Sequence, residues 1–88
     1  MAKYKRYVVR VVVAYSDKNQ DVHLQWAEQL RYMGHAKIHT VASRTDITNV
    51  IDLLPPHDVD SYVWAKQNAD RMTSFGYNAV AAPEMSNG

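Results

Sequence analysis

The sequence predicts an α+β domain of the ferredoxin-like type, a βαββαβ sandwich in which two helices cover one face of an antiparallel sheet. Three observations lead to this fold class: a valine-rich N-terminal strand, two helical segments that each end at a glycine, and a faint internal repeat. The repeat places Trp-Ala-Glu-Gln at 26–29 and Trp-Ala-Lys-Gln at 64–67, each within a predicted helix. In this topology the first and third strands are central.

Residues 4–15 form the first predicted strand, because they are dominated by valine and tyrosine and contain neither glycine nor proline. Side chains alternate between the two faces of a strand. One face, predicted to enter the core, carries Tyr7, Val9, Val11, Val13 and Tyr15. The other, predicted to be partly exposed, carries Tyr4, Arg6, Val8, Arg10 and Val12.

The first helix is predicted over residues 20–33, after turn and capping residues at 16–19. Its inner stripe at helical spacing consists of Val22, Trp26, Leu30 and Met33. Gly34 is expected to end the helix in a left-handed conformation. A second strand then covers residues 36–42.

Residues 43–54 are ambiguous, because apolar residues there match both a helical stripe and the alternation of a strand. Residues 43–46 suit a four-residue hairpin loop, which favours a third strand. Pro55 and Pro56 end that segment.

A second helix is predicted over residues 59–75, with His57 and Asp58 as its cap. Its inner stripe consists of Tyr62, Ala65, Ala69 and Met72. Gly76 ends it, and a last strand covers residues 77–82. Residues 1–82 are therefore expected to form one domain, and residues 83–88 a flexible tail.

Composition narrows the classes of function. The 88 residues contain no cysteine, which excludes disulfides, thiolate zinc sites and cysteine nucleophiles. The formal net charge of +1 provides no global attraction to nucleic acid or to an anionic membrane. No apolar run approaches the roughly 20 residues that span a bilayer. We therefore expect a cytoplasmic protein that does not enter a membrane.

The sequence offers no catalytic or metal-binding motif. His35 and His39 are four residues apart, but four residues of a strand span roughly 13 Å, too far for one metal ion. A glycine-flanked serine, a phosphate-binding glycine loop and a dinucleotide fingerprint are all missing from the sequence. We therefore expect no catalytic residue, metal or cofactor, although a site assembled from scattered residues needs no motif.

The sheet face without helices is the candidate binding surface. It is predicted to present aromatic, basic and aliphatic side chains, a composition enriched at protein interfaces. Its candidate residues are Tyr4, Arg6, Val8, Arg10, Lys37 and His39. The leading hypothesis is a non-enzymatic module or inhibitor that binds a larger protein partner, a profile common among proteins of phages and mobile elements.

Three alternatives stay open. The same face could bind nucleic acid, although the third strand lacks the aromatic residue that RNA-recognition folds use there. Two open faces could pack together in a homodimer, including a small dimeric α+β barrel enzyme. The two arginines could also serve only to keep the face hydrated.

Overall fold

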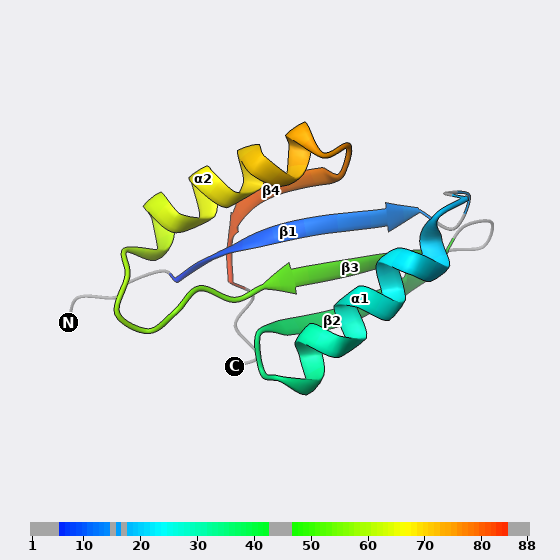
Figure 1. Cartoon of the computed structure of the whole chain (residues 1–88), viewed down its shortest axis with the longest axis horizontal. Helices are drawn as coiled ribbons and strands as arrows, with labels where there is room; N and C mark the ends of the chain where they lie inside the picture. Colours follow the sequence, from blue (N-terminus) through cyan, green and yellow to red (C-terminus); the bar gives the residue numbers. More distant parts are fainter. Residues whose placement is uncertain (1–5, 15, 17, 43–46, 85–88) are drawn as a thin grey trace.

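A computed structural model of the chain describes residues 6–14, 16, 18–42 and 47–84. Along the chain these residues form strand β1 (Tyr7–Ala14), helix α1 (Gln20–Tyr32), strands β2 (Ala36–Ala42) and β3 (Ile47–Leu53), helix α2 (Ser61–Ser74) and strand β4 (Asn78–Pro83) (Figure 1). The ambiguous segment before the prolines is therefore a strand. Strand β1 begins at Tyr7, whereas the prediction began at residue 4. The predicted hairpin loop at 43–46 lies outside the described residues, as do residues 4, 5 and 15 of the predicted first strand.

The four strands form one antiparallel sheet in the order β2-β3-β1-β4. The first and third strands are central, as predicted, and the α+β fold class is confirmed. Strand β1 is paired on both sides, with Val11 opposite Ile51 of β3 and Ala79 of β4. The most valine-rich segment therefore occupies the position with the least access to water.

The core lies between the sheet and the two helices. The predicted alternation of β1 is confirmed, because Val9, Val11 and Val13 are buried on the helix side. The helices contribute alanines: Ala27 from α1, and Ala65 and Ala69 from α2. These small side chains let each helix approach the strands closely, so packing density is reached without large residues.

Helix α1 turns only part of the predicted stripe toward the core: Trp26 and Leu30 pack there, as predicted, but the two ends of the stripe do not. Val22 and Met33 were expected inside, but their exposed fractions are 65% and 58%. Ala27 is the buried residue, with Trp26 and Leu30 packed beside it. The helix is rotated because the small Ala27, rather than the bulky Trp26, makes the closest approach to the sheet.

Helix α2 begins two residues later than predicted. Its N-cap is Asp60, not His57 and Asp58, and the Asp60 carboxylate accepts hydrogen bonds from the amides of Tyr62 and Val63 at 3.0 and 3.2 Å. Ser61 accepts a further bond from the amide of Tyr7, which joins the helix start to β1. Both helices end as predicted, at glycines with φ of 79° and 97°.

None of the described helices is long and apolar enough to cross a membrane.

Replacing Asp60 with alanine removes the cap of α2, and we expect the free energy of unfolding to fall by about 1 kcal/mol. The measurement is denaturant unfolding followed by circular dichroism. Asp58→Ala is the matched control, because it removes the same charge from an exposed residue that forms no side-chain hydrogen bond with the described chain. Equal destabilisation by both substitutions would contradict the assignment of the cap.

Candidate functional site: the sheet face without helices

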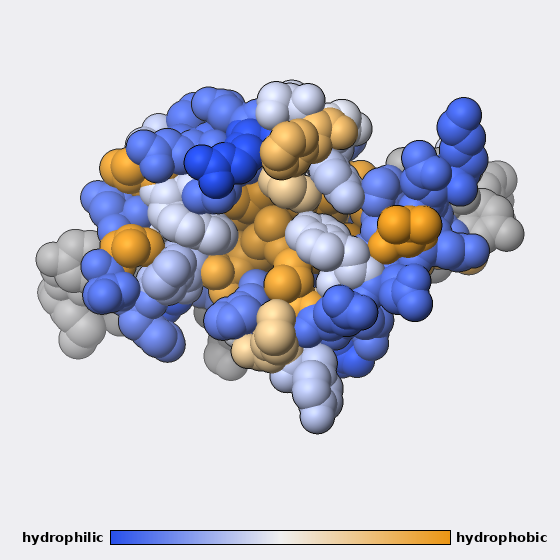
Figure 2. Space-filling model, in the orientation of Figure 1, coloured by the Kyte–Doolittle hydropathy of each residue, from blue (hydrophilic) through white to orange (hydrophobic). Residues whose placement is uncertain are grey.

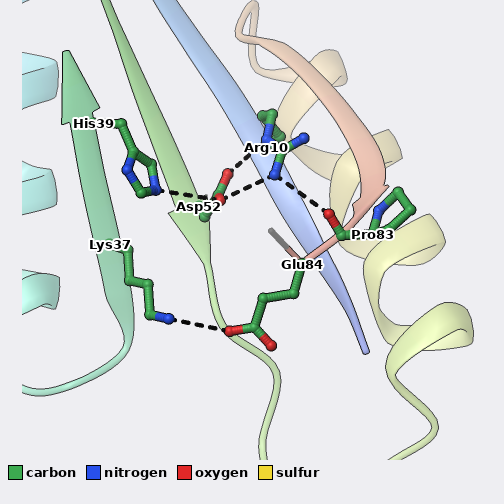
Figure 3. A network of polar contacts seen from close by, with 6 residues as sticks. All are labelled: Arg10, Lys37, His39, Asp52, Pro83 and Glu84. Atoms are coloured by element: carbon green, nitrogen blue, oxygen red, sulfur yellow. Dashed lines mark hydrogen bonds and ion pairs between the residues drawn. The ribbon is translucent and has the colours of Figure 1, made fainter. Parts of the chain in front are cut away.

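The helix-free face of the sheet carries a row of charged residues across its two central strands and one edge. Arg10 of β1 lies directly opposite Asp52 of β3, and Asp52 lies opposite Lys37 of β2. Figure 3 shows this row together with His39 and Glu84. Side chains of directly opposite residues on neighbouring strands point to the same face of a sheet, and so do side chains two residues apart along one strand. Arg10, Asp52 and Lys37 therefore share one face, and His39 joins them because it is two residues from Lys37.

Arg10 and Asp52 form a two-bond ion pair at the centre of this face. The Arg10 Nε donates to one carboxylate oxygen of Asp52 at 2.8 Å, and Nη2 donates to the other at 3.1 Å. The Asp52 side chain is only 2% exposed, although no helix covers this side of the sheet. Burial of a carboxylate is costly without a partner, so Arg10 is required for Asp52 to lie there.

The pairing raises the pKa of Arg10 above its usual value. The hydrogen bond to Asp52 is the main cause, the coulombic attraction of Asp52 adds to it, and partial burial opposes it. When folding raises the pKa of a cation, the cation stabilises the folded protein fully at any pH below its pKa in the unfolded state. This stabilisation is lost only as the pH rises through its pKa in the folded state. Arginine titrates far above neutral pH, so its half of the pair persists across the physiological range.

The other cations of this face also contact the protein itself. Lys37 pairs with the carboxylate of Glu84 at 3.3 Å, and Arg6 donates to the carbonyl oxygen of Pro55 at 2.6 Å. His39 Nε2 lies 3.7 Å from Asp52, too far for a hydrogen bond. Among the described residues, therefore, the charges of Arg10 and Lys37 are matched by those of Asp52 and Glu84.

The side chain of Glu84, the residue that follows β4, reaches across one end of the face. The Glu84 amide donates to the carbonyl oxygen of Arg6, while its carboxylate reaches Lys37 on the opposite edge strand. Val8, which was predicted to be partly exposed, is fully buried near this end. Of the predicted flexible tail, Pro83 belongs to β4 and Glu84 is held by these contacts, whereas residues 85–88 lie outside the described residues.

The same face also exposes valines on both edge strands: Val80 lies opposite Arg10, and Val41 lies farther along, opposite Thr48. Val41 on β2 is 57% exposed and Val80 on β4 is 53% exposed, and both point to the helix-free side. Val12 and Val50 are paired with each other on the central strands and are half-buried. The face therefore combines apolar side chains at its edges and centre with a neutral pair of charges.

Most of the predicted site residues lie together on this face, but their environments differ. Arg6, Arg10, Lys37 and His39 are at least partly accessible, Val8 is not, and Tyr4 lies outside the described residues. Sequence reasoning did not identify Asp52, Glu84 or Val80. The alternation of the third strand placed Ile51 inward and therefore Asp52 outward, which was the available signal for a partner of Arg10.

The histidines do not assemble a metal site. His35 lies in the turn before β2 and borders the gap between the helices, whereas His39 is on the helix-free side of the sheet. Within the described part of the chain, no three His, Asp or Glu side chains are grouped as a metal ion would need.

Comparisons with protein-family models, with curated proteins and with solved structures found no match to this chain.

Removing one partner of the central ion pair should destabilise the protein strongly. We expect Arg10→Met to lower the free energy of unfolding by about 3 kcal/mol, because it leaves the buried carboxylate of Asp52 unpaired. Arg31→Met is the control: Arg31 pairs with Glu28 on the exposed face of α1, so its loss should leave the free energy of unfolding almost unchanged.

The double variant Arg10→Met, Asp52→Leu should recover most of the lost stability, because replacing a whole buried pair with apolar residues is often neutral. Denaturant unfolding of all four proteins measures these differences. A double variant as unstable as Arg10→Met alone would contradict the view that the unpaired carboxylate is the cause.

Proposed function

We propose that this protein is a non-enzymatic binding module or inhibitor that uses the helix-free face of its sheet to bind a larger protein partner in the cytoplasm. One observation carries the proposal: the face exposes Val41 and Val80 on its two edge strands, and at its centre the charges of Arg10 and Asp52 neutralise each other. Burying the centre of this face against another protein would desolvate apolar surface without leaving the charge of Arg10 or of Asp52 unpaired.

The internal pairing favours a protein over a nucleic acid. Phosphate binding relies on lysines and arginines whose charge is available to the backbone of the nucleic acid. Here Arg10 and Lys37 are engaged by Asp52 and Glu84, and a phosphate would have to displace or oppose those carboxylates. Nucleic-acid binding by this face is therefore the weaker alternative.

The structure also indicates which substitutions test the face without unfolding the protein. Charge reversal at Arg10 would place two carboxylates together in the sheet and would destabilise the fold itself. Val41→Lys with Val80→Lys instead adds two charges to exposed positions on the edge strands. Val22→Lys with Val63→Lys adds the same charge to exposed positions on the two helices, and is the matched control.

The experiment is affinity capture from lysate of the source cells with the wild type and these two double variants, after circular dichroism has confirmed that all three fold. We expect the Val41/Val80 variant to lose the partner proteins that the wild type and the Val22/Val63 variant both retain. Identical partners for all three proteins would remove the proposed surface.

Two further measurements separate the alternatives. We expect light scattering to give the mass of a monomer, 10.1 kDa. If the wild type and the Val22/Val63 variant were dimers and the Val41/Val80 variant were a monomer, the face would be occupied by a second copy of the chain and not by a larger partner. Salt-sensitive binding of single-stranded RNA or DNA would favour the nucleic-acid alternative.

A further inference from the structure

The opposite side of the sheet contains an apolar pocket that the proposed function does not use. Helix α1 packs mainly on β2, and helix α2 packs on β1 and β4, so β3 lies beneath the gap between the helices. Figure 2 shows apolar surface exposed in this gap. The pocket has a volume of about 350 Å³, and its residues are Leu30, His35, Leu53, Leu54, Pro56, Trp64, Asn68, Arg71 and Met72.

Side chains from one face of α2 line one side of the pocket. Trp64, Asn68, Arg71 and Met72 follow one another at helical spacing, and Leu30 of α1 lies across from them. The Asn68 amide donates to the carbonyl oxygen of Trp64 at 2.8 Å, so this polar side chain is tied to the wall. The lining is therefore mostly apolar, with Asn68, Arg71 and His35 as its polar side chains, a composition typical of small-molecule sites.

Aromatic rings close the gap between the two helices beyond the pocket. Tyr77, whose amide is bonded to the carbonyl oxygen of Met72, packs its ring against His23 and Trp26 of α1 at centroid distances of 4.7 and 5.9 Å. A partner helix lying along the full gap would meet these rings. The open part is thus a compact pocket, at the small end of the roughly 300–1,000 Å³ typical of ligand sites.

Arg71 gives the pocket a charge preference. The side chains of Arg71 and His35, which both line the pocket, form no ion pair or hydrogen bond with the described residues. In contrast, carboxylates pair with Arg10, Arg31 and Lys37. A guanidinium with all its donors available is suited to a carboxylate, which it can bind through two hydrogen bonds. The pocket therefore combines an apolar interior with one available cation at its border.

We propose that this pocket binds a small carboxylic acid with an apolar chain or ring, which would lie between Leu30 and Trp64 while its carboxylate pairs with Arg71. The ligand is a free small molecule rather than a peptide, because the pocket is short and the rings of Tyr77 and its neighbours on α1 close the gap beyond it. The proposal does not depend on the function of the opposite sheet face, and either can fail alone.

Decanoate is the probe, and Trp64 is the reporter. In a Trp26→Phe background the fluorescence comes from Trp64 alone, because the sequence has two tryptophans. We expect a saturable change in Trp64 emission with decanoate below its micelle concentration. Arg71→Gln should raise the Kd for decanoate at least about fivefold, while leaving the weaker binding of uncharged decanol unchanged.

Arg31→Gln is the matched control, because it removes an arginine from the exposed face of α1, outside the pocket, and should leave the Kd unchanged. Thermal unfolding checks that both variants fold. Any of three results would overturn the proposal: no saturable signal with decanoate, the same Kd after Arg71→Gln, or equally tight binding of decyltrimethylammonium. A dimer that Arg71→Gln dissociates would also overturn it, because the pocket would then be an interface between copies.

Discussion

The pairing of Arg10 with Asp52 is the interaction on which the helix-free face depends. The two residues lie opposite each other on the two central strands, and the carboxylate is almost completely buried. Apolar residues at both positions would make the centre of this face more hydrophobic and less hydrated. A charged residue at only one of them would destabilise the fold, because its charge would have no partner. The ion pair lets the centre of the sheet remain polar and neutral at the same time.

This neutrality determines which partners suit the face. Charges that are already satisfied within a protein do not need to be matched by a partner, so specificity then rests on shape and on the exposed valines at the sheet edges. Glu84, which follows β4, neutralises a second cation of this face by pairing with Lys37. Two of the basic residues that the sequence places on this face, Arg10 and Lys37, are thus neutralised by carboxylates in the structure. This neutralisation favours a protein over a nucleic acid as the partner.

On the other side of the sheet, small residues determine the geometry. Ala65 and Ala69 bring α2 onto β1 and β4, and Ala27 brings α1 toward the opposite edge of the sheet. Because α1 packs mainly on β2 while α2 packs on β1 and β4, the sheet between the two helices is only partly covered. Leu53 on β3 is left as part of a pocket instead of being sealed in the core.

The sequence was sufficient to predict the order of elements, the two central strands and the inward face of β1, because these depend on local alternation and on strong terminators such as Gly34 and Gly76. It was insufficient for the phase of α1, where the choice between Ala27 and Trp26 is made by packing against the sheet. It also missed the partner of Arg10, since cross-strand pairing depends on the register of β1 with β3. The pocket could not be predicted at all, because it arises from the spacing between two helices.

The most direct test of the central ion pair is NMR detection of the arginine Nε–H groups at neutral pH. The buried pair predicts that the Arg10 Nε–H exchanges slowly with water and shows a nuclear Overhauser contact across the strands to the β protons of Asp52. The Nε–H of Arg71, which has no described partner, should exchange fast. An Arg10 Nε–H that exchanges as fast as that of Arg71 would contradict the account.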